Sequence, residues 1–371
     1  MPEAQATFGS VMARTWRENM LFSVLVELTY RCNLDCFFCY NDVNLRGKPL
    51  ATPQLQAFFR DLADLGVLNL TLSGGEPLAH PDFFLLGRTA RELGFVVRVK
   101  SNGHALRDTI ARRLRDEVDP YMVEVSLHGA CAATHDQQTR VPGSFDRLLG
   151  NLATLRALGM RLKINSTLTV WNETEIEGMF AIADGLGVPL QFDPEVTPRD
   201  DGSREPLSIS PTREGVLRLF RLEFERGEAA ARAAAGAPGA TPVTTPAPAA
   251  GAPPGKHCGA GSSGIAVDPY GNVYPCVQWR RPVGNLHAST IAEIWARSRG
   301  LAEVRELTAD VKTALAGERD AAFFNFCPGI AETTGGSPLA VYEGARQRAT
   351  TIRQVIDERS PRSRGSLPVI R

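Results

Sequence analysis

Three cysteines near the start of the chain have a spacing that could bind metal. Cys32, Cys36 and Cys39 follow a β-rich run with the spacing C-x3-C-x2-C. Thiolates are soft ligands for iron and for zinc. A structural zinc site normally takes four protein ligands, and the sequence offers no fourth Cys or His nearby. Three ligands leave one metal position open, where a reactive small molecule can bind.

A second cysteine group lies in the last third of the chain. Cys258 and Cys276 flank Gly271 with the spacing C-x12-G-x4-C, and residues 265–276 predict a β-hairpin that turns at Tyr-Gly-Asn. Cys327 is the one cysteine later in the sequence. Cys131 stands alone, and a lone cysteine is usually a small buried or loop residue.

The bulk composition excludes several classes of function. Lys plus Arg and Asp plus Glu both number 41 in 371 residues, so the net charge is zero and no basic field for nucleic acid is expected. No apolar run is long enough to span a bilayer, and residues 1–20 lack the apolar stretch of a signal peptide. We therefore expect a cytoplasmic protein with no membrane or nucleic-acid partner. Seven cysteines, an odd number placed unevenly, favour metal binding over disulfides.

Short β-rich runs alternate with helical runs between about residues 22 and 193. Apolar residues in the helical runs, such as 52–66 and 144–159, recur at three- and four-residue steps. Such alternation predicts a parallel sheet, as an open partial barrel or a doubly wound sheet, with chemistry at the carboxyl ends of the strands. The expected strands are 23–29, 67–73, 95–101, 121–127, 161–168 and 189–193. The glycines expected to end helices are Gly66, Gly94, Gly159 and Gly187.

Composition also divides the chain into regions. Residues 227–255 are rich in Ala, Pro and Gly and bury too little surface to offset their ordering entropy, so the Pro-rich half of this segment is expected to be a linker. The expected regions are an N-terminal extension (1–21), a barrel (22–226), the linker (227–255), a second domain (256–342) and a C-terminal helix with its tail (343–371).

The segment LTYRCNLDCFFCYN (28–41) resembles the signature of the radical SAM superfamily, C-x3-C-x-aromatic-C, with Phe38 as the aromatic residue. The resemblance implies an α/β protein with a partial (β/α)6 TIM-like barrel and a [4Fe–4S] cluster on Cys32, Cys36 and Cys39. In that family the fourth iron binds S-adenosylmethionine (SAM), and an electron from the cluster releases a 5′-deoxyadenosyl radical. A zinc knuckle or a redox dithiol is the alternative interpretation of these cysteines.

Further motifs of this family follow the next strands in order. SGGEP (73–77) resembles the GGE motif, in which a carboxylate accepts hydrogen bonds from the methionine ammonium group. By the same resemblance SNG (101–103) touches the ribose or methionine, and the guanidinium fork of Arg140 suits the ligand carboxylate. Taken singly, Gly-Gly-Glu and Asn-Gly are ordinary turns and Arg140 is a surface charge. The expected cofactor-binding residues are Phe38, Gly74, Gly75, Glu76, Ser101, Asn102, Glu124, Ser126, Arg140 and Asn165.

The hairpin segment resembles the opening of SPASM and twitch domains, which append auxiliary iron–sulfur clusters to radical SAM barrels. A full SPASM domain has more cysteines and two such clusters, whereas this chain has three cysteines after residue 200. The resemblance implies a small C-terminal α+β domain with one auxiliary [4Fe–4S] cluster on Cys258, Cys276 and Cys327. Its fourth iron would be open or bound by a residue such as His257. A zinc site, or no metal, is the alternative.

Similar two-part enzymes act mostly on peptides. The resemblance implies hydrogen abstraction from a ribosomally made peptide, which then forms a crosslink, a thioether, an epimer or an oxidised residue. Expected partners are an electron donor such as flavodoxin or ferredoxin and a separate leader-peptide recognition protein. The alternatives are a radical SAM enzyme of small-molecule or cofactor biosynthesis (haem, molybdopterin or aminoglycoside type) and a non-catalytic iron–sulfur protein. Candidate residues at the substrate mouth are Asp193, Glu195 and Arg199.

Overall fold

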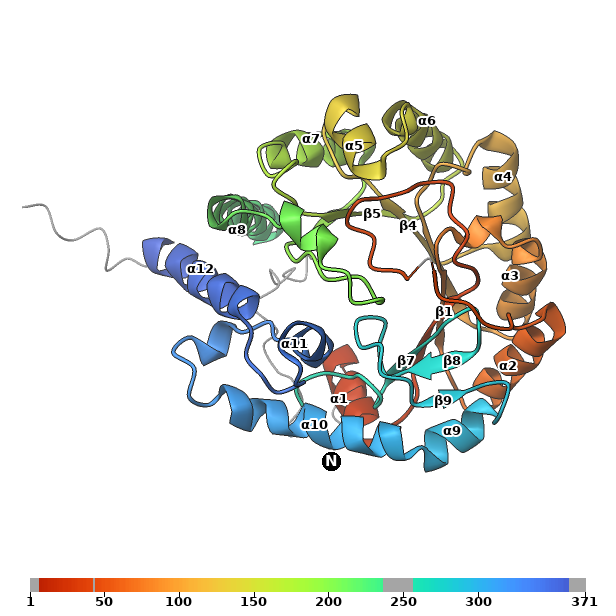
Figure 1. Cartoon of the computed structure of the whole chain (residues 1–371). Helices are drawn as coiled ribbons and strands as arrows, with labels where there is room; N and C mark the ends of the chain where they lie inside the picture. Colours follow the sequence, from red (N-terminus) through yellow and green to blue (C-terminus); the bar gives the residue numbers. More distant parts are fainter. Residues whose placement is uncertain (1–6, 43, 236–255, 360–371) are drawn as a thin grey trace, which may run out of the picture.

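Six parallel strands form the inner wall of a partial barrel in the computed structural model, which describes residues 7–42, 44–235 and 256–359 (Figure 1). Neighbouring strands pair in sequence order, each parallel to the next. The strands are β1 (Ser23–Glu27), β2 (Asn69–Ser73), β3 (Val96–Ser101), β4 (Met122–Ser126), β5 (Leu162–Thr167) and β6 (Leu190–Asp193). The expected α/β partial barrel and all six expected strands are confirmed.

Helices connect the strands on the outside of the sheet (Figure 1). In α2 the residues Leu55, Phe58, Phe59 and Leu62 lie one turn apart and form a buried stripe against the sheet. The four glycines expected to end helices have φ between 62° and 85°, as predicted. The helices are α2 (Thr52–Asp64), α3 (Phe83–Glu92), α4 (Asp108–Arg113), α5 (Ala132–Thr139), α6 (Ser144–Ala157), α7 (Ile176–Leu186) and α8 (Arg213–Ala235), with short turns η1 (Pro77–Ala79), η2 (Leu114–Val118) and η3 (Glu205–Ile209).

Alternation along the strands gives the barrel an apolar outer face and a polar inner face. Leu70, Leu72, Val99 and Val123 have no exposed surface and belong to the main core with the helices. Side chains at the intervening positions point to the opposite face of each strand. These intervening side chains include Arg98, Lys100, Glu124, Lys163 and Asn165. The inner face is therefore suited to polar ligands.

The second region extends the same sheet. Strand β7 (Gly264–Val267) pairs parallel with β1, and β8 (Asn272–Tyr274) and β9 (Gly284–Asn285) follow in antiparallel order. The nine strands run β6-β5-β4-β3-β2-β1-β7-β8-β9. The expected hairpin is confirmed, and the buried Asp268 carboxylate shapes its turn by accepting hydrogen bonds from the backbone of Tyr270 and Asn272, both at 2.9 Å.

Helices after the hairpin run across the open side of the barrel towards α8 (Figure 1). They are α9 (Ile291–Arg297), α10 (Arg299–Leu315), η4 (Ala321–Phe323), α11 (Pro328–Gly335) and α12 (Glu343–Arg359). α12 contacts α8, where Arg221 and Glu358 form an ion pair at 2.7 Å. A second apolar cluster holds this side together and consists of Val311, Leu315, Phe326, Ala331 and Ala345.

Two features of the ends of the regions were not expected from the sequence. A helix, α1 (Phe8–Glu18), lies in the N-terminal extension, and Lys256 Nζ donates to the Trp16 carbonyl at 2.9 Å. α8 continues to Ala235, into the range expected as linker, while 236–255 and the tail 360–371 lie outside the described residues.

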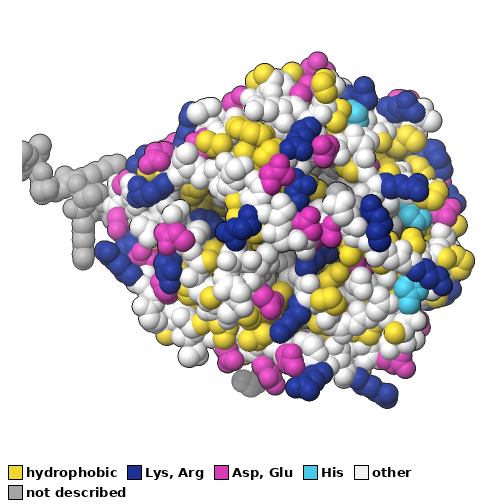
Figure 2. Space-filling view, viewed as in Figure 1, with side chains coloured by type: hydrophobic (Ala, Val, Ile, Leu, Met, Phe, Trp, Pro, Cys, Tyr) yellow, Lys and Arg dark blue, Asp and Glu magenta, His cyan; other side chains and the backbone are white. Residues whose placement is uncertain are grey.

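The surface carries both signs of charge. Lys and Arg side chains are interspersed with Asp and Glu over the face in Figure 2, in keeping with the balanced composition. Within the described ranges, no helix is long and apolar enough to cross a membrane.

Candidate functional site

The first cysteine loop follows β1 and is held from one side by a neighbouring helix. The backbone N–H groups of Asp35 and Phe37 donate to the carbonyls of Thr139 and Gln138, at 3.1 and 2.9 Å, in the last turn of α5. The loop itself has no regular secondary structure, so such anchors decide where its thiols lie.

The Gly-Gly pair after β2 forms the base of this loop. Gly75 N–H donates to the Thr29 carbonyl at 2.7 Å. A Cβ on Gly74, whose φ is 134°, would lie 2.3 Å from that same carbonyl oxygen, and one on Gly75 would lie 2.7 Å from the Arg31 carbonyl oxygen. Only glycines allow so close an approach. The approach that the structure records is between the two backbone segments, and it fixes the start of the cysteine loop.

Glu76 ties the ends of β2 and β3 together next to the first cysteine. Its buried carboxylate accepts hydrogen bonds from Ser101 Oγ at 3.0 Å and from Asn102 N at 2.9 Å, and burial raises its pKa to about 7. Asn102 Nδ2 lies 3.6 Å from Cys32 Sγ and donates to Asn33 Oδ1 at 2.8 Å. The structure thus brings Cys32, Glu76, Ser101 and Asn102 together at the carboxyl end of the sheet.

A second polar group lies deeper on the inner face. Glu124 accepts a hydrogen bond from Asn165 Nδ2 at 2.9 Å and pairs with Lys100 at 3.7 Å. Burial alone would raise the pKa of Glu124, but Lys100 and Asn165 bring it below its ordinary value. Ser126 ends the same strand and is half-buried. Lys100 on β3 is the register partner of Glu124 on β4, and Ser126 on β4 is the register partner of Asn165 on β5.

The later cysteines come from three separate segments. Cys258 precedes β7, Cys276 follows β8, and Cys327 caps the N-terminus of α11. α11 packs tightly on the turn after Cys276, because a Cβ on Gly329 would lie 2.3 Å from the Gln278 carbonyl oxygen. His257 Nε2 donates to the Phe326 carbonyl at 2.9 Å, so this nitrogen braces the residue before Cys327.

Comparison with known proteins shows that the first cysteine group, and Cys258 and Cys276 of the second, lie in segments that match known protein families. A model of the radical SAM superfamily matches residues 26–182, and a model of the SPASM iron–sulfur cluster-binding domain matches residues 258–316. Mycofactocin maturase MftC from Mycobacterium tuberculosis is 31% identical over 291 residues, which span 76% of this chain and 71% of MftC. The chain belongs to the radical SAM superfamily.

Two further relatives and one solved structure are also similar to this radical SAM chain. AdoMet-dependent heme synthase from Methanosarcina barkeri is 29% identical over 76% of this chain and 83% of its own length. PqqA peptide cyclase from Ruegeria pomeroyi is 30% identical over 68% of this chain and 67% of its own. The structure of native anSMEcpe with bound AdoMet and the Cp18Cys peptide shares the fold, with a TM-score of 0.66, 16% identity and coverage of 92% and 98% of the two chains.

This radical SAM enzyme uses a [4Fe–4S] cluster and SAM, and its SPASM domain adds an auxiliary iron–sulfur cluster. The donors present fit these groups, because all seven cysteines are free thiols. Burial, and then the charge of a neighbouring cysteine, raises the pKa of Cys36 and of Cys327, the latter to about 12. Within the described part of the chain, no three His, Cys, Asp or Glu side chains surround a single ion. Thiols around a cluster stand farther apart, because the iron atoms lie between them.

Two expected SAM contacts of this radical SAM enzyme lie around the cysteine loop with protein partners of their own. The ring of Phe38 lies 4.5 Å from that of His128, which is buried. Arg140 lies over the Phe37 ring at 4.6 Å and pairs with Asp35 at 3.4 Å. As placed, Arg140 braces the cysteine loop, and its role towards the SAM carboxylate stays a prediction.

The residues expected at the substrate mouth also have partners. Glu195 pairs with Arg348 of α12 at 2.8 Å and its backbone N–H donates to Asp193, while Arg199 donates to the Phe37 carbonyl at 3.3 Å. Glu195 and Arg199 therefore connect the loop after β6 to α12 and to the cysteine loop.

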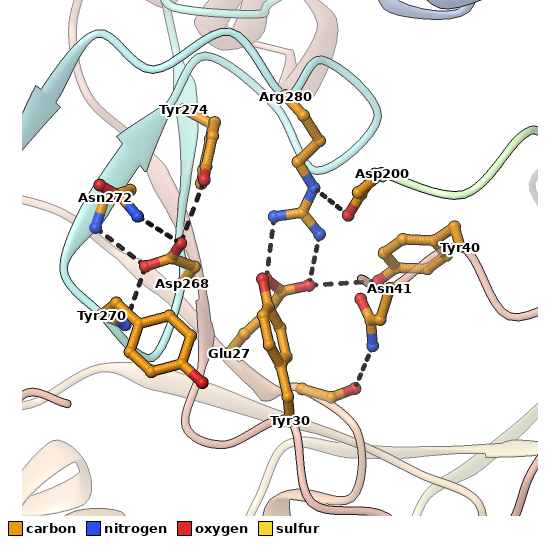
Figure 3. A network of polar contacts seen from close by, with 11 residues as sticks. Glu27, Tyr30, Tyr40, Asn41, Asp200, Asp268, Tyr270, Asn272, Tyr274 and Arg280 are labelled. Carbon is orange, nitrogen blue, oxygen red and sulfur yellow. Dashed lines mark hydrogen bonds and ion pairs between the residues drawn. The ribbon is translucent and has the colours of Figure 1, made fainter. Parts of the chain in front are cut away.

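Sequence reasoning missed a buried ion cluster that joins β1, the loop after β6 and the segment after Cys276 (Figure 3). Arg280, after the hairpin, pairs with Glu27 at the end of β1 and with Asp200 after β6. The acidic Glu27 within an apolar strand run was a usable signal. Nothing local distinguishes Arg280 from its neighbour Arg281.

Proposed function

We propose that Cys32, Cys36 and Cys39 hold the radical SAM cluster and that Glu76 and Asn102 line the adjoining SAM site. The supporting observation is that three free thiols of one loop lie at the carboxyl end of the sheet, with the Asn102 amide 3.6 Å from Cys32 Sγ. When bound, the cluster and SAM supply a 5′-deoxyadenosyl radical for hydrogen abstraction. The chain's own residues orient both groups and exclude water.

The remaining proposed SAM contacts are supported partly by position and partly by resemblance to the family. Gly74 and Gly75 shape the base of the loop, and Ser101 fixes the Glu76 carboxylate. Phe38, Glu124, Ser126, Arg140 and Asn165 are assigned by resemblance to the family. The polar inner face supports the assignments of Glu124 and Asn165, which are hydrogen-bonded to each other.

For the second region we propose one auxiliary [4Fe–4S] cluster held by Cys258, Cys276 and Cys327. In this assignment residues 22–226 form the catalytic barrel and residues 256–342 the auxiliary domain. The Nε2–H of His257 is engaged with a carbonyl oxygen. This hydrogen bond leaves the Nδ1 lone pair of His257 free. We assign the fourth iron position to water or substrate, with His257 Nδ1 as the alternative ligand.

A peptide is the substrate that we propose. PqqA peptide cyclase and MftC, a maturase, are relatives at 30% and 31% identity, and anSMEcpe holds a peptide together with AdoMet. Lys100, Lys163 and Arg98 lie on the inner face, and their N–H groups beyond those engaged with Glu124 and Gln191 suit a polar peptide backbone. The alternative is a small molecule such as a tetrapyrrole, which the heme synthase relative favours because 83% of its length is covered. An electron donor of the flavodoxin or ferredoxin type and a leader-recognition protein are the proposed partners.

Anaerobic reconstitution tests the proposal in two stages. With dithionite and SAM, the wild-type enzyme should release 5′-deoxyadenosine and methionine, and replacement of Cys32, Cys36 and Cys39 by Ala should stop it. A cysteine variant that still releases 5′-deoxyadenosine at the wild-type level would overturn the cluster assignment. Iron should number about eight per chain if both clusters are [4Fe–4S] and about four if only one is.

Deuterium transfer then separates the two substrate classes. A deuterated peptide substrate should pass deuterium to 5′-deoxyadenosine, while a deuterated tetrapyrrole should not. The reverse result would replace the peptide proposal by the small-molecule one.

A further inference from the structure

A buried ion cluster joins strand β1 to the segment that follows Cys276 (Figure 3). Glu27 has no exposed surface, and the side chain of Arg280 is 12% exposed. Arg280 donates from Nη1 and Nη2 to the two carboxylate oxygens of Glu27 at 2.9 and 2.7 Å. Such a two-pronged pair is directional as well as strong.

This ion cluster reaches the first cysteine loop through aromatic residues. Tyr30 OH donates to Glu27 at 3.1 Å, and Tyr40 OH donates to it at 3.4 Å. Tyr40 directly follows Cys39 in the chain, and the Arg280 guanidinium lies 5.5 Å from its ring centroid. Contacts to Glu27 therefore hold both ends of the segment that carries the three thiols.

A third contact closes the arrangement from the side of the barrel. Asp200 Oδ2 lies 2.9 Å from Arg280 Nε, and the Asp200 backbone N–H donates to the Tyr40 carbonyl at 2.7 Å. Arg280 thus faces the carboxylates of Glu27 and Asp200. The backbone of Asp200 is also hydrogen-bonded to the cysteine loop.

Arg280 itself belongs to the auxiliary region. It lies four residues after Cys276, its guanidinium packs 5.1 Å from the ring centroid of Tyr274, and the intervening turn is closed by a hydrogen bond from Trp279 N to the Cys276 carbonyl at 3.1 Å. The same short segment therefore carries an auxiliary cysteine and the partner of Glu27.

We propose that Arg280 is a positioning residue by which the auxiliary region fixes the first cysteine loop for SAM. The loop has no secondary structure of its own, and its anchors include the last turn of α5, the Gly74–Gly75 base, Arg140, Arg199 and this ion cluster. A loop that shifts at Cys39 would misplace the open iron relative to the SAM site. This inference rests on the cysteine assignment proposed above.

The test compares Arg280→Gln, Glu27→Gln and the double variant in the reconstituted enzyme, with Arg281→Gln as the matched control. Arg281 is more exposed and pairs with Glu332 at 3.9 Å. The readouts are iron content, melting temperature and the SAM-induced change in the electron paramagnetic resonance spectrum. That change occurs only in a cluster that SAM ligates, so it distinguishes the first cluster from the auxiliary cluster.

We expect each single variant to need about tenfold more SAM for the spectral change, with iron content unaltered. Arg280→Gln should also melt at lower temperature, because it leaves the carboxylates of Glu27 and Asp200 without their cation, whereas Glu27→Gln leaves Arg280 paired with Asp200 and should melt closer to wild type. The double variant leaves one carboxylate unpaired instead of two, so its melting temperature should recover towards wild type while its SAM response stays impaired. Arg280→Lys keeps the charge without the fork and should fall between wild type and Arg280→Gln.

Three results would overturn the proposal. One is a SAM response in Arg280→Gln that equals that of Arg281→Gln. Another is a double variant whose SAM response recovers together with its melting temperature, which would make the pair merely stabilising. If Arg280→Gln does not fold, a normal SAM response in both Arg280→Lys and Glu27→Gln has the same consequence. Loss of the cysteine assignment is detected separately, by a wild-type enzyme that shows no SAM-induced change.

Discussion

The two cysteine sites differ in how the chain assembles them. The first takes all three thiols from one loop after one strand, whereas the second gathers them from a loop, a strand end and a helix N-terminus. A site within one loop needs anchors only to orient it. A site from distant segments exists only after those segments pack, since each long loop closure costs entropy. The first site should therefore still form when the second site is damaged. The exact placement of its cysteine loop nevertheless depends on the auxiliary region through Arg280.

The largest expected effect separates the chemistry of the two sites. Cys36→Ala should reduce 5′-deoxyadenosine release to the level without enzyme, because a cluster with two cysteine ligands is not held for SAM. Release is measured by chromatography after anaerobic incubation with dithionite and SAM. Cys131→Ala, which removes an exposed thiol near Glu175, serves as control and should behave as wild type. Equal loss in both variants would remove the distinction.

The next effect concerns the second site alone. Cys276→Ala should lower iron from about eight to about four per chain and stop product formation, while SAM cleavage without product continues. Iron and 5′-deoxyadenosine are measured on the same sample. An unchanged iron content would contradict the auxiliary assignment.

Close-approach glycines offer a subtler contrast between the sites. A Cβ at Gly74 or at Gly329 would lie 2.3 Å from a carbonyl oxygen. Substitution of either glycine by Ala should therefore lower the free energy of unfolding by about 2 kcal/mol. Gly74→Ala should lower the melting temperature and the SAM response together. Gly329→Ala should lose auxiliary iron first.

The control for these glycines lies in α6. Gly150→Ala meets no atom within 4 Å and should stabilise its helix by roughly 0.5–1 kcal/mol. Indistinguishable melting curves for all three variants would show that neither close approach matters.

The smallest expected effect asks whether His257 is a ligand or a brace. His257→Gln keeps a donor for the Phe326 carbonyl, so iron content and the auxiliary spectrum should not change. His257→Ala should cost about 1 kcal/mol of stability through the lost hydrogen bond. A spectral change in the Gln variant would instead make His257 an iron ligand.

Local patterns carried most of the prediction. The six strands and their helices followed from periodicity, and the placement of Cys32, Cys36 and Cys39 on one loop after a strand followed from their spacing, because these signals lie within short segments. The pairing of β7 with β1 and the partnership of Arg280 with Glu27 were not predicted. Such contacts join residues far apart in the chain, and neither partner shows locally which residue it will meet. The same limit applied to Arg140, whose contacts with Asp35 and Phe37 depend on how α5 ends.

Strand β1 is an interior strand of the sheet only because the hairpin covers one of its sides. A polypeptide that stops at residue 235 would keep all six barrel strands yet present a bare row of backbone donors and acceptors along β1. Uncovered sheet edges recruit strands from other molecules. Such a truncated protein should self-associate, so the hairpin also acts as a guard against aggregation for the barrel to which it is attached.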